Sequence, residues 1–226
     1  MSSDPLWEPI VSTHFPSLSS LHRSPSPVPF RRLYTLGRAS AVRRLRKPTK
    51  PVLRLADLVF SISLHDGNSH VFTVEKPGSE LRSDQDGVFR FDFDVLGGSG
   101  TNSVAVGVGG LRVTWNVVLE GYKGVFTMMD RCCKGKGVFV GWFTEELPKT
   151  TGCCYGGGCC SGGGYGGTGS GLVADLRLGL LRGGGGGKEV VVEKVGVGMM
   201  NVVCWRYSSV EDALGYLQHF LMPYAV

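Results

Sequence analysis

From residue 55 onward, apolar and polar side chains alternate along the chain, which is the spacing of β-strands that bury one face. The clearest case is Phe89, Phe91 and Phe93, which alternate with arginine and aspartate. Residues 138–143 are apolar on both sides, so a central strand is expected there. Strands are predicted over residues 58–64, 70–75, 89–93, 104–108, 111–119, 125–129, 138–143, 172–180, 190–192 and 202–205.

Glycine and aspartate turns separate these short strands. Asp66, Gly67 and Asn68 supply the turn of a first hairpin. Regular spacing of this kind is typical of an antiparallel sandwich or a strongly bent sheet. No intervening segment is long enough for a crossover helix, which excludes a parallel βαβ architecture. The expected fold class is therefore α+β and mainly β, with short N-terminal helices and a C-terminal helix.

The most regular helical pattern closes the chain. Ser208, followed three residues later by Glu211, predicts a capping box, and Pro223 ends the helix. The side chains expected on the buried stripe recur at helical spacing. They are Val210, Ala213, Leu214, Leu217 and Leu221.

Two further helices are predicted near the N-terminus. The first covers residues 4–15, with Asp4 as its N-cap and Pro5 at the first helical position. Its apolar side chains Leu6, Ile10 and Phe15 fall roughly on one face, with Trp7 beside them. Pro16 ends this helix.

The second covers residues 30–46 and separates an apolar face from an arginine face. Its apolar positions are Leu33, Gly37, Ala41 and Leu45. The Ser- and Pro-rich residues 19–29 between the two helices are predicted to form an extended linker.

Composition predicts one core and flexible insertions. Hydrophobic residues make up 42% of the 226, which suffices for one moderate domain. The 35 glycines are concentrated in residues 150–171 and 183–187, which are predicted to be disordered because they bury too little surface. The domain organisation predicted from these patterns is residues 1–21, a linker and basic helix over 22–54, and a β-rich domain over 55–226.

Charge is unevenly distributed. The net charge is +5, yet ten of the 24 Lys and Arg residues lie between Arg23 and Arg54, where no acidic residue occurs. Three interpretations of this basic segment stay open. It could be a helix whose apolar stripe docks on the following domain, with its arginines against the acidic side chains of that domain. It could instead be a nucleic-acid or nuclear-targeting patch, or an organelle transit peptide. Its single aromatic beyond Phe30 makes nucleic acid the less favoured partner.

No cofactor or metal is expected from the motifs. The pairs Cys132–Cys133, Cys153–Cys154 and Cys159–Cys160 could supply thiolates to zinc, but adjacent cysteines rarely chelate one ion together. Residues 164–169 match a dinucleotide fingerprint, yet they lie in a glycine run that leads to a strand instead of a helix. The absence of a signal sequence or an 18-residue apolar run predicts reduced thiols and no membrane partner.

The sequence also offers no catalytic arrangement. His14, His22, His65, His70 and His219 have no nucleophile or carboxylate at a suggestive spacing. Paired carboxylates occur twice, on an exposed strand face and in a predicted loop, and both pairs are expected to be solvated. They are Asp92 with Asp94 and Glu145 with Glu146. We therefore expect a protein that is not an enzyme.

The first residues carry a family resemblance. The run Asp4-Pro5-Leu6-Trp7, an apolar pair, and Phe15-Pro16-Ser17-Leu18 resemble the C-terminal end of an F-box as found in plant F-box proteins. The likeness continues more loosely through residues 29–34. Residues 205–207 and 212–221 are similar to the closing segment of one plant F-box group. The F-box's leading segment and central helices would lie before Met1, so a truncated motif is expected.

The resemblance implies a function. F-box proteins bind a Skp-type adaptor of a cullin-based ubiquitin ligase and recruit a protein substrate through a downstream domain. It implies that Pro5, Leu6 and Trp7 face the adaptor, that the β-rich domain or its Gly/Cys loop faces the substrate, and that the protein is cytoplasmic or nuclear. The alternative from the residues alone is a nucleic-acid-associated or nuclear protein that uses residues 31–54.

Overall fold

The structure is a computed structural model that describes residues 4–23, 27–43, 53–67, 69–81, 87–95, 103–105, 111–133, 141–150, 171–182 and 189–222. The predicted flexible insertions, the fingerprint-like residues 164–169 and two of the cysteine pairs lie outside these residues, apart from Thr150 and Gly171 at the ends of the first insertion. Most of the second half of the basic segment, residues 44–52, lies outside them as well. The domain boundaries at residues 21 and 54 stay predictions.

The first sheet holds four antiparallel strands in the order β2-β1-β5-β6. The hairpin predicted around Gly67 is confirmed, because β1 pairs with β2 on either side of it and Gly67 takes the left-handed φ of 57°. A turn of this kind favours glycine, since a Cβ is strained there. The strands are β1 (Leu58–Asp66), β2 (Ser69–Pro77), β5 (Leu111–Leu119) and β6 (Gly124–Cys133).

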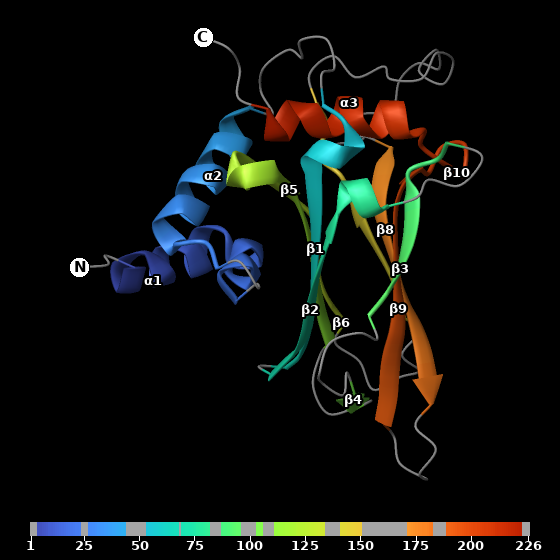
Figure 1. The fold of residues 1–226 in the computed structure, drawn as a ribbon, viewed down its shortest axis with the longest axis horizontal. Helices are drawn as coiled ribbons and strands as arrows, with labels where there is room; N and C mark the ends of the chain where they lie inside the picture. The colour runs from blue at the N-terminus through green and yellow to red at the C-terminus, as the bar shows by residue number, and fades with distance from the viewer. Residues whose placement is uncertain are drawn as a thin grey trace.

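The second sheet faces the first and is antiparallel throughout, which confirms the expected mainly β fold class. Its main order is β10-β9-β8-β7, and β3 and β4 also pair with β9. Figure 1 shows the two sheets as neighbouring layers with the long β8–β9 hairpin in the second. The strands are β3 (Arg90–Asp94), β4 (Ser103–Ala105), β7 (Trp142–Glu146), β8 (Leu172–Arg182), β9 (Glu189–Asn201) and β10 (Arg206–Tyr207).

Aromatic rings fill the space between the sheets. Phe60 of β1 lies 5.9 Å from Phe89 and 5.9 Å from Phe91, and it stacks 6.3 Å from Trp115 of β5, between ring centroids. The predicted alternation is confirmed here, because Phe91 and Phe93 are buried while Asp92 and Asp94 are exposed. Offset and edge contacts of this kind add to the free energy gained by burying the rings.

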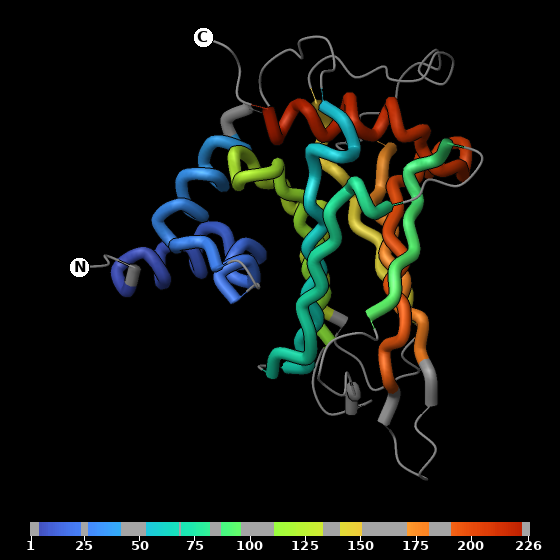
Figure 2. Tube along the Cα trace, viewed as in Figure 1, coloured from blue at the N-terminus to red at the C-terminus, as the bar shows by residue number. Residues whose placement is uncertain are grey.

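Helix α3 (Val210–Leu221) covers one end of the two layers. Figure 2 shows it lying across the strand ends at the top of the view. Phe220 stacks on Phe126 of β6 at 4.0 Å, and Ala213 and Leu217 are fully buried. The helix was predicted with Ser208 as its cap, but Ser209 takes that role and accepts a hydrogen bond from the Asp212 amide. The difference arises because Ser208 is already paired with Met199 through its backbone.

The N-terminal helices cover the outer face of the first sheet. They are α1 (Asp4–His14), the 3₁₀ helix η1 (Pro16–Arg23) and α2 (Phe30–Arg43), seen as the blue elements in Figure 1. They form a second apolar cluster with Val118 and Val125 of the sheet. Short 3₁₀ turns also occur at η2 (Leu55–Asp57), η3 (Gly78–Glu80) and η4 (Glu120–Tyr122).

The linker prediction is wrong for residues 19–23. These residues continue η1, and Leu21 is fully buried. His22 then stacks on Phe30 at 4.1 Å and its Nδ1 lies 2.9 Å from the Val28 carbonyl. The apolar face of the sheet offers these residues a partner that local composition does not reveal.

Helices α1 and α2 bury faces that differ in part from those predicted. In α1 the fully buried side chain is Val11, whereas Leu6 is 66% exposed. In α2, Leu33 and Gly37 are buried as predicted, but Leu36 is buried as well and Ala41 is exposed. The apolar surface of the sheet, together with the ring of Phe15 against Gly37, decides which face turns inward.

Two strand predictions are corrected by the structure. Among the described residues, strand β7 comes last in its sheet order and pairs with β8, so Trp142 and Phe143 do not belong to a central strand, and Trp142 is 51% exposed. Residues 138–140 of the predicted strand lie outside the described residues. Residues 202–205 form a turn instead of a strand. In that turn the Asn201 side chain accepts hydrogen bonds from the amides of Val203 and Cys204. Such local side-chain bonds compete with strand formation.

The contact between α3 and β6 predicts a sensitive glycine. A Cβ on Gly124 would lie 2.1 Å from the Leu221 carbonyl oxygen, which forces backbone movement. We expect Gly124→Ala to lower the free energy of unfolding by about 3 kcal/mol, the upper end for overpacking, in urea titrations. The control is Gly67→Ala, where the φ of 57° is strained but nothing lies within 4 Å. It should cost about 1 kcal/mol, and equal losses in the two variants would contradict the packing argument.

Candidate partner-binding surfaces

The three residues predicted to face an adaptor lie in the first turns of α1. Pro5 is exposed, and Leu6 exposes 66% of its surface. Trp7 is half-buried, with its ring centroid 5.4 Å from that of Tyr34 in α2. The structure thus leaves Pro5 and Leu6 open to a partner, whereas Trp7 also serves the packing of α1 on α2.

Aromatic contacts fix the direction of α1. The ring of Tyr34 lies near two rings at the C-terminal end of α1, with the centroid of His14 at 6.2 Å and that of Phe15, the residue after the helix, at 5.8 Å. Phe15 also lies directly on Gly37, where an added Cβ would meet the ring at 2.8 Å. The exposed Leu6 is therefore carried by a helix with a defined orientation relative to α2.

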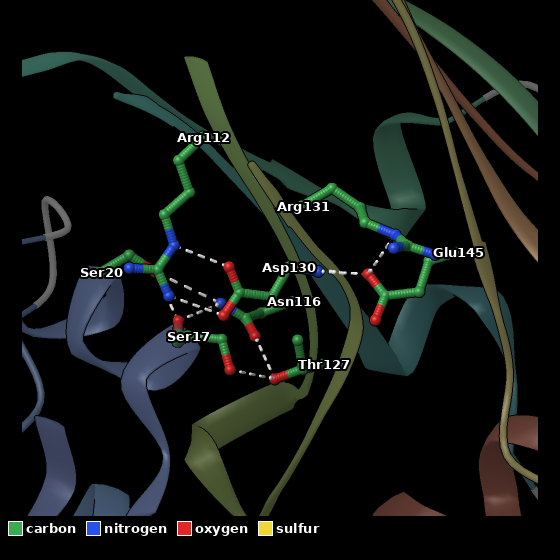
Figure 3. Close-up of polar contacts among 8 residues, drawn as sticks. All are labelled: Ser17, Ser20, Arg112, Asn116, Thr127, Asp130, Arg131 and Glu145. Atoms are coloured by element: carbon green, nitrogen blue, oxygen red, sulfur yellow. Dashed lines mark hydrogen bonds and ion pairs between the residues drawn. The ribbon is translucent and has the colours of Figure 1, made fainter. Parts of the chain in front are cut away.

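A buried amide joins these helices to the first sheet. Asn116 of β5 is fully buried and donates from Nδ2 to the Ser17 carbonyl at 3.2 Å and to Ser20 Oγ at 3.3 Å. Its Oδ1 accepts from Thr127 Oγ1 at 2.8 Å, and Thr127 in turn lies 3.2 Å from Ser17 Oγ. Figure 3 shows the Asn116 amide between Ser17 and Ser20 of η1 and Thr127 of the neighbouring strand β6. Asn116, Ser17, Ser20 and Thr127 thus satisfy one another's hydrogen-bonding groups. A buried polar cluster of this kind fixes one position of η1 on the sheet.

A second link joins α2 to the tight turn η4. Arg32 donates from Nη2 to the Gly121 carbonyl at 3.1 Å and to the Tyr122 carbonyl at 3.0 Å. Gly121 and Tyr122 both have positive φ, 70° and 53°. A non-glycine residue in this region is strained, and the arginine holds the turn in place. Arg32 thus contacts the β-rich domain, which agrees with the interpretation of the basic segment as a docked helix. Among the described residues, its hydrogen bonds go to backbone carbonyls of the domain and not to acidic side chains.

An ion-pair network runs along the edge of the same sheet. Arg112 pairs with Asp130 at 2.7 Å, and Glu145 Oε2 accepts from the Asp130 amide at 2.7 Å. Glu145 also lies 3.6 Å from the Arg131 guanidinium. The expectation that Glu145 lies in a loop is wrong: it belongs to β7, is half-buried and links the two sheets (Figure 3). Burial raises its pKa.

A separate polar cluster lies on the outer face of the second sheet. Asp175 of β8 is only 2% exposed, and it accepts hydrogen bonds from the Trp142 indole and from the Tyr207 hydroxyl, the latter at 2.6 Å. Arg177 pairs with the same carboxylate at 3.2 Å and lies over the Trp142 ring at 5.6 Å. Together these side chains hold two aromatic rings and a guanidinium rigidly at the surface.

Sequence reasoning missed this cluster. Asp175 and Arg177 alternate with the leucines of β8, a pattern that predicts a solvated face and not a buried carboxylate. A signal was present in the glycines of β9, since Gly198 lies under the Tyr207 ring, 2.7 Å from where a Cβ would stand. Glycine in a strand marks such close approach, but the approaching side chain could not be named from the sequence.

Nearby, a turn presents further apolar side chains. Trp205 is 73% exposed and Val203 is 69% exposed, and both belong to the turn between β9 and β10. Trp205 has a positive φ of 53°. With Trp142, they are three of the four large hydrophobic side chains found exposed in the described ranges, and Leu6 is the fourth. Leu6 lies apart from the others, on the N-terminal helices.

The remaining candidate chemistry is limited. In the described part of the chain, no group of three or more His, Cys, Asp or Glu side chains could hold a metal ion. A cavity of about 650 Å³ adjoins Arg54 and Asp57, and the ion pair of 3.2 Å between these two residues occupies the carboxylate. Hydrogen bonds from Arg54 lower the pKa of Asp57. No helix within the described ranges is long and apolar enough to cross a membrane.

The nucleic-acid interpretation of the basic segment stays a prediction. Arg31 and Arg38 are exposed on α2. Arg44 and Arg46, which follow α2 in the same basic segment, lie outside the described residues.

Comparison with known proteins identifies one relative. The chain is 27% identical over 227 residues to a probable F-box protein of Arabidopsis thaliana, in an alignment that takes in 98% of this chain and 70% of that protein. No protein-family model matches the chain, and no solved structure matches it. The relative confirms the resemblance to plant F-box proteins that the two ends of the sequence indicated.

The Asn116 cluster predicts an energetic coupling between strands and helices. Asn116→Leu removes three hydrogen bonds, and Thr127→Val takes from the buried Asn116 Oδ1 its hydrogen-bond donor. Each change should lower the free energy of unfolding by about 2 kcal/mol. Because the two side chains bond each other, the double variant should lose less than the sum, with a coupling of about 1 kcal/mol. Thr73→Val in β2 is the control, and its effect should add to that of Asn116→Leu. If the losses in unfolding free energy measured by urea titration add for Asn116→Leu with Thr127→Val as they do for Asn116→Leu with Thr73→Val, the network is contradicted.

The Asp175 cluster predicts a pH dependence. Burial, together with the hydrogen bond to Asp175 and the charge of that carboxylate, raises the pKa of Tyr207 to about 12. Since the folded pKa exceeds the ordinary value of about 10, this proton's contribution to stability is complete below pH 10 and is lost as the pH rises through 12. The difference in phenolate absorbance between the wild type and Tyr207→Phe should show a transition near pH 12. In Asp175→Asn it should move toward 10. A wild-type transition already near 10 would refute the arrangement.

Proposed function

We propose that this chain, which is similar to a plant F-box protein over nearly its whole length, is a non-catalytic, substrate-recruiting subunit of a Skp–cullin–F-box ubiquitin ligase. The similarity over 98% of the chain is the observation that carries the proposal. It takes in the N-terminal helices and the β-rich part together. A role in the cytoplasm or nucleus follows from this proposal.

The N-terminal helices are the adaptor-binding side in this proposal. Pro5 and Leu6 contact the Skp-type adaptor, and Leu6 supplies the apolar anchor because most of its side chain is exposed. Trp7 is a positioning residue, since its ring packs on Tyr34 at 5.4 Å and holds α1 on α2. An exposed leucine on a firmly oriented helix is a favourable binding group, because little conformational freedom is lost when it is covered.

The β-rich part would carry the protein substrate. The outer face of the second sheet supports this assignment, because it presents Trp142, Arg177 and Tyr207 around the buried Asp175. Tryptophan, tyrosine and arginine dominate the binding energy of protein interfaces. This surface and the helices lie on opposite sides of the two sheets (Figure 1), so an adaptor and a substrate could bind without obstructing each other.

A pull-down with a plant Skp adaptor tests the proposal. Two forms are compared, the chain as it stands and the chain extended at its N-terminus by a complete F-box sequence. Leu6→Ala should weaken adaptor binding about ten-fold in whichever form binds, the loss expected for an anchoring leucine. Val203→Ala is the matched control, since Val203 is 69% exposed and lies in the turn between β9 and β10.

The outcomes separate the roles of the two parts. Binding by both forms would make α1 sufficient for adaptor contact, and binding by the extended form alone would limit the present chain to substrate recruitment. Binding by neither form, or equal effects of Leu6→Ala and Val203→Ala, would contradict the assignment of this face.

A further inference from the structure

A surface cavity lies between helix α2 and the turn η4, and we call it the α2–η4 pocket. Its volume is about 440 Å³, and pockets that accept ligands measure roughly 300–1,000 Å³. Helix α2 contributes Arg31, Arg32 and Leu36 to the wall, and the chain at η4 contributes Tyr122 and Lys123. The two arginines and the lysine are exposed, so the pocket opens to solvent.

The charged side chains of the described wall are all basic. They are Arg31, Arg32 and Lys123. Among the described residues, Arg31 and Lys123 form no ion pair. The acidic residue of η4 is Glu120, but it lines the neighbouring cavity beside Asp57 instead. The pocket therefore carries positive charge that no side chain of its described wall neutralises.

The hydrogen bonds of the wall leave several donors available. Arg32 uses its Nη2 for the two carbonyls of η4, at 3.1 and 3.0 Å, and its Nε and Nη1 lie outside these bonds. Thr35 Oγ1 donates to the Arg31 carbonyl at 3.0 Å, so the proton of this hydroxyl is already engaged. Binding of an acceptor in the pocket therefore falls to the guanidinium and ammonium groups.

One side of the pocket is apolar. Pro29 and Leu36 line it together with Tyr122. The positive φ of Tyr122, 53°, directs this residue toward the second apolar cluster, against which it packs. A ligand that matches the whole wall therefore combines negative charge with an apolar group.

We propose that the α2–η4 pocket binds an acidic segment of a partner protein. Carboxylates of that segment pair with Arg31, Arg32 and Lys123, and one of its apolar side chains rests against Pro29 and Leu36. Charge complementarity selects this partner, because guanidinium groups bind carboxylates strongly and a cationic pocket repels basic segments. The inference does not rest on the proposed ligase role, since the adaptor-facing turns of α1 take no part in it.

Nucleic acid fits this pocket less well. Single strands bind through aromatic rings on which their bases stack, whereas the ring of Tyr122 is half-buried and packs on the second apolar cluster. A phosphate backbone also requires cations spread along its length. Here three cations surround one cavity of about 440 Å³, which favours a short peptide segment.

A binding titration of the full chain with a synthetic peptide tests the proposal. The peptide alternates glutamate and leucine, and a comparison peptide carries glutamine in place of every glutamate. Fluorescence anisotropy at about 0.15 M salt, where exposed charges more than about 8 Å apart are largely screened, measures both affinities. The glutamate peptide should bind about ten-fold more tightly, because a hydrogen bond to a charged group is roughly twice as strong as a neutral one.

Single variants locate the binding site. Arg31→Gln and Lys123→Gln should each weaken binding of the glutamate peptide about five-fold, the upper range for an exposed ion pair. Arg38→Gln is the matched control, because Arg38 is exposed on the same helix and does not line the pocket. It removes the same charge and should leave the affinity unchanged. The three replaced side chains are exposed, so each variant should keep the melting temperature of the wild type.

Three results would overturn the proposal. Equal affinity for the glutamate and glutamine peptides would remove the role of charge. An equal loss in Arg38→Gln and Arg31→Gln would indicate general attraction to the basic surface of α2 instead of binding in the pocket. A third is binding of an oligothymidine strand that Arg31→Gln and Lys123→Gln weaken, in the absence of glutamate-peptide binding, which would make nucleic acid the occupant.

Discussion

The buried amide of Asn116 is the contact on which the arrangement of this molecule depends. It lies in the middle of β5, where the other face of the strand already serves the core between the sheets. Its bonds to Ser17, Ser20 and Thr127 tie η1 to the sheet. An apolar side chain at this position would permit several helix positions, whereas an amide with satisfied partners permits few. The α2–η4 pocket depends on this position, because η1 and α2 belong to one apolar cluster.

A second buried polar group organises the opposite side. Asp175 is a carboxylate on the outward face of a sheet, covered by the aromatic side chains that bond to it. Desolvating a charge is expensive unless it is paired and hydrogen-bonded, and here Trp142, Tyr207 and Arg177 meet that requirement together. The result is a surface with fixed rings. The two polar groups thus hold different surfaces, one where helices dock and one that stays open.

The sequence allowed most elements of the fold to be predicted, but fewer of the contacts. Period-two alternation located the strands around Phe91, Trp115 and Leu176, and the capping pattern located α3 to within one residue. The errors share a cause. Residues 19–23 look like a linker because their composition is polar, and residues 202–205 look like a strand because they are apolar. In both cases an interaction with a distant or neighbouring side chain overrides the local preference.

What the sequence determined by itself is the class of fold, the antiparallel pairing, the terminal helices and the resemblance to plant F-box proteins, because periodicity and short motifs are local properties. Tertiary structure alone decided which faces meet. Alternation shows that Asn116 and Asp175 lie opposite core residues of their strands, yet it cannot tell that helices cover one and aromatic rings the other. The α2–η4 pocket joins residues far apart in the chain, such as Arg31 and Lys123. Their proximity results from packing, which no local pattern encodes.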